Sequence, residues 1–251
     1  MHIFVINLPK DQERRQAVGK QFSRLRLDYE VIPGVNGEVL SKEELVQSYN
    51  QKKALRIQCR PLVPAEIGCA LSHIAVYRTI IERQLPYALI LEDDVELPDE
   101  LPRIINALER RLDSTYRKVI LLSPAAVDEK DAICFVRDYR ITSFKSGCFA
   151  HAYIVTRSAA SALLKFLYPV ADVADCWTRL KRHRVVDIEG VTPAVIAQNQ
   201  VAFGSSTTID LTKAGVHKIK ENTLDKFIFK SRRAFWLFVD WILAQAQYHR
   251  Q

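Results

Sequence analysis

The sequence predicts an α/β fold with a mainly parallel central sheet. Residues 3–8 are a short apolar run, residues 11–25 carry apolar side chains at helical spacing, and residues 29–32 are a second strand-like run. A strand, a helix and a strand within about 30 residues make a βαβ unit. Strands and helices alternate in the same way further along the chain, which favours a parallel sheet with helices on its faces.

Local signals assign the elements that follow. Ser41 and Glu44 form a capping box, which predicts a helix over residues 41–51. Residues 56–64 are basic and are expected to be irregular. The other expected elements are helices over 64–83, 98–112, 157–167 and 175–182, strands over 87–91, 118–122, 152–156, 185–188 and 195–196, and a hairpin over 128–144.

The composition is that of an ordinary globular protein with a moderate positive charge. Of the 251 residues, 48% are apolar and 26% are charged, and the formal net charge is +7. That charge fits a phosphate-bearing substrate, an anionic membrane surface or a nucleic acid. The basic residues are dispersed and the sequence contains no nucleic-acid-binding motif, so we expect no nucleic-acid partner.

The cysteines and the N-terminal residues indicate a cytoplasmic protein. The five cysteines are odd in number and include no Cys-x-x-Cys pair, so their spacing indicates neither a zinc site nor a disulfide framework. We expect reduced and mostly buried thiols. Residues 1–7 read as the first strand of the fold, without the basic segment and apolar core of a signal peptide.

Three consecutive acids at the end of a strand are the strongest functional signal. The apolar run 87–91 stops at Glu92, Asp93 and Asp94. A strand that ends there delivers carboxylates to the carboxyl edge of the sheet, where open α/β folds bind ligands. If the strand pitch continues, Glu92 and Asp94 point to one side and suit a divalent cation that also binds a diphosphate. The alternative is a solvated acidic strand end.

A second candidate segment follows the first strand. It runs from Asn7 to Arg15 and includes Arg14, and these side chains could hold a nucleotide base or a phosphate. A solvated first helical turn is an equally consistent interpretation. The chain has neither a dinucleotide-binding glycine fingerprint nor a P-loop.

A third candidate segment opens the helix predicted from residue 64. Glu66, Ser72 and His73 are its polar members among small and apolar residues. A single histidine on a helix is more often a structural residue than a ligand. Here Gly68 would permit the close approach of a ligand or of a neighbouring strand, which weakens the structural interpretation.

Together these segments resemble glycosyltransferase family 25, the lipooligosaccharide galactosyltransferases of Gram-negative bacteria. The family's opening strand and Arg-rich helix are matched by Asn7-Leu8 and Arg14-Arg15, its Gly-Cys-x-x-Ser-His element by residues 68–73, and its acidic strand end by residues 90–95. Residues 147–164 look like its later strand–helix element. The resemblance covers about residues 1–210.

The resemblance implies a GT-A type, Rossmann-like nucleotide-sugar transferase fold over residues 1–212. Residues 213–251 follow as a separate basic and aromatic C-terminal segment. The resemblance also implies a D-x-D-type motif that binds Mn²⁺ or Mg²⁺, with Asp94 as the safest ligand and Glu92 as the second. The donor-binding residues that it implies are Asn7, Leu8, Arg14, Glu66, Gly68, Ser72, His73 and Asp93.

The reaction implied by the resemblance is an inverting transfer of galactose from UDP-galactose to a sugar of a lipooligosaccharide core. Such a displacement needs a carboxylate as general base. Asp175 is the first candidate and Asp172 the second, although either could instead cap a helix. His151 is a further candidate for a sugar or metal contact, and residues 198–208 could close over the site.

Other functions stay open at this point. The donor could be UDP-glucose, or the chain could be a transferase-like module that binds a sugar nucleotide without turnover. The acidic triplet argues against such a module, because adjacent carboxylates repel one another and a site without function has no reason to keep them.

The C-terminal segment predicts an amphipathic helix. Residues 225–250 combine many aromatic side chains with Lys and Arg, and their apolar run from Ala234 to Ala246 is shorter than the about 20 residues of a membrane span. The segment could bind an anionic membrane surface or pack on the domain or on a second subunit. A membrane contact would suit a lipid-anchored acceptor and a peripheral location on the inner face of the cytoplasmic membrane.

Overall fold

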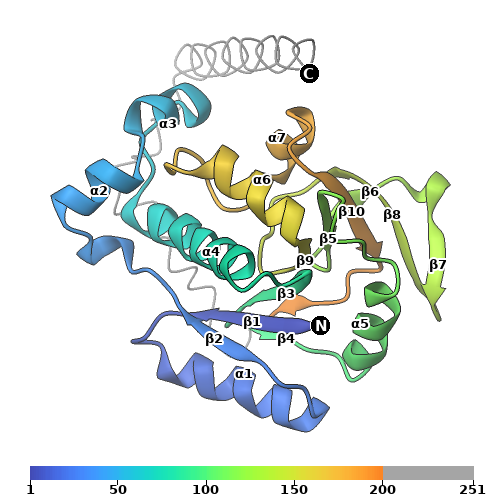
Figure 1. The fold of residues 1–251 in the computed structure, drawn as a ribbon. Coiled ribbons are helices and arrows are strands. Elements are labelled where there is room, and N and C mark those ends of the chain that lie inside the picture. The colour runs from blue at the N-terminus through green and yellow to red at the C-terminus, as the bar shows by residue number, and fades with distance from the viewer. Residues whose placement is uncertain (200–251) are drawn as a thin grey trace, which may run out of the picture.

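The structure, a computed structural model, describes residues 1–199, which build a nine-stranded central sheet and a separate two-stranded one (Figure 1). The central strands, in order across the sheet, are β2 (Glu30–Pro33), β1 (His2–Asn7), β3 (Tyr87–Glu92), β9 (Ala152–Thr156), β5 (Lys118–Leu121), β10 (Asp187–Thr192), β8 (Tyr139–Ser146) and β6 (Ala126–Val127), with β7 (Ile133–Val136) paired to β8. The small sheet pairs β4 (Val95–Glu96) with β11 (Ala197–Gln198).

Most of the long strands point the same way. β1 is parallel to both β2 and β3, and β10 is parallel to β5. β9 runs antiparallel between β3 and β5, so those two strands share one direction. The predicted α/β fold with a mainly parallel central sheet is confirmed, and so is the opening βαβ unit. The antiparallel insertion of β9 was not predicted.

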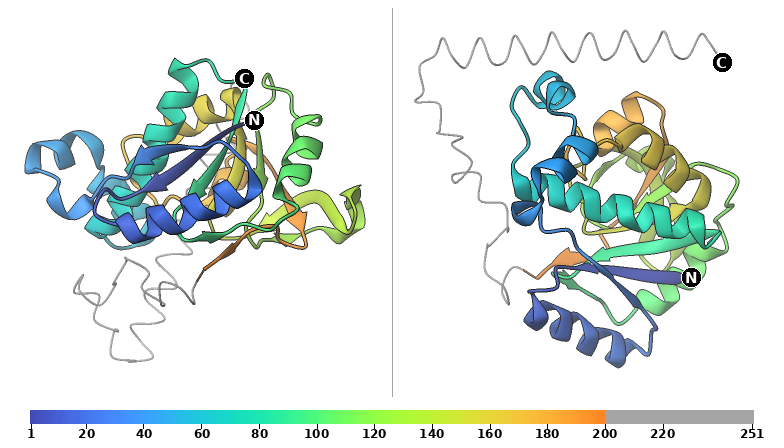
Figure 2. Two further views of the ribbon diagram at one scale, coloured as in Figure 1. Left: turned by 90° about the horizontal axis from the view of Figure 1, so that it is seen from below. Right: turned by 60° about the vertical axis from the view of Figure 1, so that its left-hand side comes forward.

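Helices cover both faces of the central sheet (Figures 1 and 2). The α4 and α6 helices pack on one face, and α1 and α5 pack on the other. The helices are α1 (Gln12–Leu25), α2 (Lys42–Ser48), α3 (Gln51–Gln58), α4 (Pro64–Glu82), α5 (Leu101–Glu109), α6 (Arg157–Leu167) and α7 (Trp177–Arg182), with short 3₁₀ turns at Gly37–Val39 and Glu129–Asp131.

The β3 strand is buried on both faces by the alternation of its side chains. Ala88 and Ile90 belong to the core under α4 and α6, and Leu89 and Leu91 belong to the core under α1 and α5. All four side chains are fully buried. Because β3 lies inside the sheet between β1 and β9, the acids at its end reach solvent only at the carboxyl edge.

The region after residue 41 differs in part from the prediction. The capping box of Ser41 and Glu44 is confirmed, but the helix that it opens ends at Ser48. Tyr49 is extended and bridges Val170, so α3 begins as a separate helix and reaches Gln58 inside the stretch expected to be irregular. A long-range strand contact breaks the helix there, and Asn50, whose side chain accepts from Lys53 N at 2.9 Å, caps the new helix.

Several other expectations can be compared with the described residues. The hairpin over 128–144 is confirmed as β7 and β8. All five cysteines are free thiols, but Cys134 and Cys148 are exposed and the others are partly buried. Within residues 1–199, no helix has the length and apolarity needed to cross a membrane. The segment over 198–208 that could close over the site lies outside the described residues from residue 200 onward, and so does the predicted C-terminal helix over 225–250.

Candidate active site

A pocket of about 400 Å³ opens at the carboxyl ends of β1, β2 and β3. The start of α4 and the loop before β9 form further parts of its wall. Acidic and basic side chains and two thiols therefore meet at the sheet edge where α/β folds bind ligands. The polar and charged lining residues are Lys10, Asp11, Arg14, Asn36, Glu38, Glu66, Cys69, Ser72, His73, Glu92, Asp93, Asp94, Cys148, His151, Asp175 and Gln198.

The acidic triplet does not continue the strand pitch. β3 ends at Glu92, and Asp93 and Asp94 form the turn that leads into β4. The expected strand geometry over these acids is therefore wrong, and each carboxylate meets a different neighbour. Asp93 accepts a hydrogen bond from Asn7 Nδ2 at 2.7 Å and forms an ion pair with Arg14 at 3.3 Å.

Asp94 is the acid that lacks a full set of partners. Its Oδ2 lies 3.4 Å from Gln198 Nε2 and 4.0 Å from Arg14 Nη1. Its Oδ1 is buried, and no hydrogen-bond partner for it exists among residues 1–199. Burial, together with repulsion by Glu92 and Asp93, raises the pKa of Asp94 to about 6. A buried carboxylate oxygen with a free lone pair beside other carboxylates fits a hard divalent cation.

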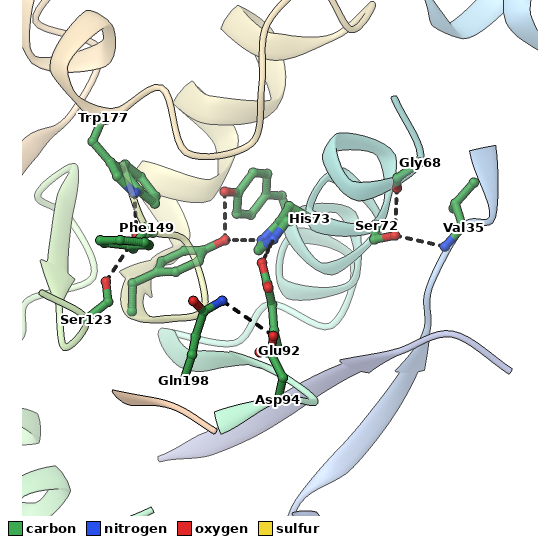
Figure 3. A network of polar contacts seen from close by, with 12 residues as sticks. Val35, Gly68, Ser72, His73, Glu92, Asp94, Ser123, Phe149, Trp177 and Gln198 are labelled. Atoms are coloured by element: carbon green, nitrogen blue, oxygen red, sulfur yellow. Dashed lines mark hydrogen bonds and ion pairs between the residues drawn. The ribbon is translucent and has the colours of Figure 1, made fainter. Parts of the chain in front are cut away.

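Glu92 stands at the end of a buried hydrogen-bond chain (Figure 3). Its Oε1 lies 3.3 Å from His73 Nε2, and His73 Nδ1 lies 2.8 Å from the hydroxyl of Tyr153. The Tyr153 hydroxyl in turn contacts that of Tyr77 at 2.8 Å. Burial alone would raise the pKa of Glu92, but the hydrogen bond and charge of His73, with His151 and Arg14, outweigh it and hold that pKa below its ordinary value.

His151 is a second histidine in the pocket wall, immediately before β9. Its backbone carbonyl accepts a hydrogen bond from Glu92 N, which places the two residues side by side. The ring Nε2 donates to Ile196 O at 3.1 Å, so Nδ1 is the unprotonated nitrogen of the neutral ring. Nδ1 is buried and has no partner in residues 1–199. Burial lowers the pKa of His151, which keeps that lone pair available to a ligand.

The two candidate bases, Asp175 and Asp172, have different surroundings in the structure. Asp175 lines the pocket, and burial is the main cause that raises its pKa to about 6, assisted by the charges of Glu92 and Asp172. Asp172 is almost fully buried and does not line the pocket. Its carboxylate is bound by Gln58, by the Val173 backbone at 2.9 Å and by Arg179 at 3.4 Å.

Most of the predicted donor-binding residues line the pocket, but two of them do not. Leu8, Arg14, Glu66, Ser72, His73 and Asp93 line the pocket, whereas Asn7 and Gly68 do not. Both oxygens of Glu66 bind Arg60, at 2.6 and 2.7 Å, and one also accepts from Val63 N at 2.9 Å. Glu66 thus caps α4 and anchors Arg60 while one side of it faces the pocket.

Ser72 and Gly68 fix the loop after β2 against α4 (Figure 3). The Ser72 hydroxyl donates to Gly68 O at 2.7 Å and accepts from Val35 N at 2.8 Å. A Cβ atom on Gly68 would stand 2.4 Å from Val35 O, and one on Gly37 would stand 1.7 Å from Pro64 O. The close approach expected at Gly68 is therefore made by backbone, and both glycines allow the loop to form the pocket wall.

Two parts of the pocket were missed in the sequence. The loop over 34–38 and the segment over 148–150 both line it. The carbonyl of Phe149 is held by Ser123 Oγ at 3.0 Å and by Trp177 Nε1 at 2.9 Å (Figure 3). The Asn36-Gly37 pair at the end of the second strand was a usable signal, because loops at that edge carry ligands. The segment before β9 had none.

Comparison with known proteins identifies the family of the chain. The model of glycosyltransferase family 25 (LPS biosynthesis protein) matches residues 1–178. The chain belongs to glycosyltransferase family 25. The match covers every candidate residue named above except Gln198 and spans all of β3, the acidic turn and the start of α7.

Several known proteins are similar in sequence to parts of this chain. A putative glycosyltransferase of Haemophilus influenzae is 27% identical over 172 residues, which are 66% of this chain and 57% of the relative. The human procollagen galactosyltransferase 2 is 30% identical over 121 residues, or 44% of this chain and 18% of the relative. The chain thus spans about a fifth of the human relative and over half of the bacterial one.

A likeness to a solved structure accompanies these matches. A glycosyltransferase involved in the glycosylation of the major capsid of PBCV-1 is 13% identical, with a TM-score of 0.33, over 66% of this chain and 63% of the other.

Proposed function

We propose that the pocket transfers a hexosyl group from a nucleotide-sugar donor, galactose from UDP-galactose in the first instance, to a sugar of a lipooligosaccharide or lipopolysaccharide core. The observation that carries the proposal is the buried, unpartnered Oδ1 of Asp94 in a pocket that also contains Glu92 and Asp175. Asp94 is available to bind a cation, Asp175 is available to accept a proton, and both side chains line the same pocket.

The cation would be Mn²⁺ or Mg²⁺. Asp94 and Glu92 offer the carboxylate oxygens that Mn²⁺ and Mg²⁺ prefer. When bound, such a cation would neutralise negative charge on the departing diphosphate. Arg14, whose guanidinium already pairs with Asp93, adds fixed positive charge on the same side of the pocket.

Asp175 would act as the general base. Its carboxylate accepts the proton of the acceptor hydroxyl while that oxygen attacks the anomeric carbon, and the bond from the anomeric carbon to the diphosphate oxygen breaks. A single displacement of this kind inverts the anomeric configuration. A pKa of about 6 leaves Asp175 ionised at neutral pH and basic enough to assist.

The choice of sugar and acceptor rests on the family. The family description names lipopolysaccharide biosynthesis, and the names of several relatives specify galactosyl transfer. UDP-glucose is the competing donor. A cytoplasmic chain that binds the inner face of the membrane through residues 225–250 would meet a lipid-anchored acceptor there.

The decisive experiment is a transfer screen of donors against acceptors with the full chain, in which the product linkage is determined by NMR. We expect transfer from UDP-galactose that depends on added Mn²⁺ and gives a β linkage. Asp94→Asn should remove the activity while its circular dichroism spectrum stays unchanged.

Two outcomes would contradict the proposal. Binding of UDP-galactose without hydrolysis or transfer across the acceptor panel would identify a binding module. Transfer that persists in chelator and in Asp94→Asn would remove the cation from the reaction. Transfer from UDP-glucose alone would change only the donor.

A further inference from the structure

Three side chains in the pocket offer a sulfur, a nitrogen and an oxygen as ligand atoms. Sugar transfer with a hard cation does not require this combination. Cys69 Sγ, His73 Nε2 and a carboxylate oxygen of Glu92 all lie within 4.8 Å of one another. Sulfur, imidazole nitrogen and one carboxylate form a ligand set for Zn²⁺ rather than for Mg²⁺ or Mn²⁺. The cysteine spacing in the sequence gave no sign of it, because only one cysteine contributes.

The elements that hold these residues explain why they meet. Cys69 and His73 are four residues apart on α4 and therefore share one face of the helix. That face lies over the end of β3, where Glu92 leaves the sheet. All three side chains line the pocket, so a fourth coordination position faces open space.

The distances are close to those of a tetrahedral zinc site. His73 Nε2 and Glu92 Oε1 are 3.3 Å apart. Zinc binds nitrogen and oxygen at about 2.0–2.2 Å, so two such ligands at a tetrahedral angle stand about 3.3–3.5 Å from each other. Cys69 Sγ lies within 4.8 Å of both atoms, and a Zn–S bond of about 2.3 Å would bring it to about 3.5–3.7 Å from each.

The surroundings of His73 also fit a metal ligand. Its Nδ1 contacts the Tyr153 hydroxyl at 2.8 Å, and that hydroxyl is held by Tyr77. In the metal-free chain His73 Nε2–H donates to Glu92; Zn²⁺ would replace that proton, and an Nδ1–H that donates to Tyr153 would leave the Nε2 lone pair for the metal. An outer partner of this kind fixes the tautomer and orientation of a metal-bound histidine.

We infer that Cys69, His73 and Glu92 form a Zn²⁺-binding site with one position open to the pocket. Glu92 cannot fully serve this site and the donor-bound cation at the same time. Zn²⁺ therefore competes with Mn²⁺ and inhibits transfer. This competition rests on the proposed function, whereas Zn²⁺ binding itself does not.

Binding is measured on the full metal-free chain without any donor. Titration with Zn²⁺ against a chromogenic chelator should give one equivalent per chain. Co²⁺ used as a spectroscopic substitute should give a thiolate-to-metal charge-transfer band and a tetrahedral ligand-field spectrum. The thiolate band reports Cys69 directly, and neither readout requires catalysis.

Cys69→Ser should weaken Zn²⁺ binding by more than 10- to 100-fold, since loss of an outer partner alone costs about that factor. It should also abolish the Co²⁺ thiolate band. Tyr153→Phe, which keeps the ring and removes the hydroxyl, should weaken binding by about 10-fold or more. Cys148→Ser is the matched control, because Cys148 lines the same pocket outside the cluster, and its Zn²⁺ affinity should equal that of the wild type.

The proposal is overturned if the chain binds no stoichiometric Zn²⁺, if Cys69→Ser keeps both the affinity and the thiolate band, or if Cys148→Ser is the variant that loses them. Competition is tested separately through Mn²⁺-dependent donor hydrolysis with added Zn²⁺. If added Mn²⁺ relieves the inhibition, the result supports the sharing of Glu92 by the two cations. Zn²⁺ binding without any Mn²⁺-dependent activity would contradict the proposed function and leave the zinc site standing.

Discussion

Two pairs of acids around the pocket differ in what holds them. Asp93 and Asp172, the wall acids, are each bound by one amide and one guanidinium, from Asn7 with Arg14 and from Gln58 with Arg179. Asp94 and Asp175, the pocket acids, line the cavity as Asp93 also does, but the structure gives them fewer short side-chain contacts, and the pKa of each is raised to about 6. The fold binds the first pair with its own side chains, whereas Asp94 has only long contacts to Gln198 and Arg14 and, within residues 1–199, an Oδ1 without a hydrogen-bond partner.

Because of this difference, substitutions at neighbouring positions can separate effects on stability from effects on catalysis. Asp172 and Asp175 are three positions apart, and Asp93 and Asp94 are adjacent. A substitution in a wall acid should change stability first, and one in a pocket acid should change activity first.

The largest effect is expected from Asp175→Asn. The amide keeps the shape of the side chain but cannot take the acceptor proton, so the transfer rate should fall by about 10²–10⁴-fold. Rates under saturating donor and acceptor, with the thermal midpoint beside them, check this. An equal loss in Asp172→Asn, in protein that is fully folded, would move the base to Asp172.

The next largest effect is a loss of stability in Asp172→Ala. Gln58 and Val173 N are half-buried donors that lose their acceptor, each at about 1–3 kcal/mol, and Arg179 loses an ion pair, so we expect a loss of about 2 kcal/mol or more in the free energy of unfolding. Burial raises the pKa of Asp172 in spite of Arg179, so its charge adds little. Asp172→Asn, which keeps an acceptor oxygen, should therefore lose less than Asp172→Ala in denaturant unfolding.

A smaller effect is the pH dependence that Asp175 imposes. Because its pKa is about 6 and the base acts only when ionised, the transfer rate should be level near pH 7 and above and fall about tenfold per pH unit below 6. A profile that is flat down to pH 5 would exclude Asp175 as the base.

The same pKa has a consequence for stability, with the opposite sign to that of a paired acid. The folded-state pKa of about 6 exceeds the ordinary value of 3.8, so the ionised carboxylate destabilises the native state above pH 6. Asp175→Asn removes that charge and should gain up to about 3 kcal/mol at pH 7. The gain should vanish below pH 3.8, where the wild-type carboxyl is protonated in both states.

The sequence was sufficient wherever structure depends on local pattern. The capping box at Ser41 and the apolar run that ends at Glu92 gave α2 and β3 directly. What it could not give depends on long-range pairing. β9 reads as a strand from its own residues, but its antiparallel place between β3 and β5 depends on partners far away in the chain.

The candidate site could likewise be predicted where it depends on local motifs and not where it depends on long-range pairing. Motifs next to one another in the sequence identified the acids and the start of α4, because short motifs carry residues to one sheet edge. His151 reaches the pocket only because β9 pairs with β3, and Cys69 gains its neighbours only because α4 crosses the end of that strand. The contrast between Asp172 and Asp175 depends on Gln58 and Arg179, which no local pattern connects.

The smallest effect is expected at Gln198, whose side chain contacts Asp94 from the segment after β10. Its contact with Asp94 Oδ2 is long, at 3.4 Å, whereas Asn7 holds Asp93 at 2.7 Å in a buried setting. Gln198→Ala should change the free energy of unfolding by no more than about 0.5 kcal/mol, as is usual for weakly held surface groups. The matched Asn7→Ala variant leaves Asp93 short of a buried donor and should lose about 1–3 kcal/mol. Parallel denaturant curves compare the two, and equal losses would mean that the fold holds Asp94 as firmly as it holds Asp93.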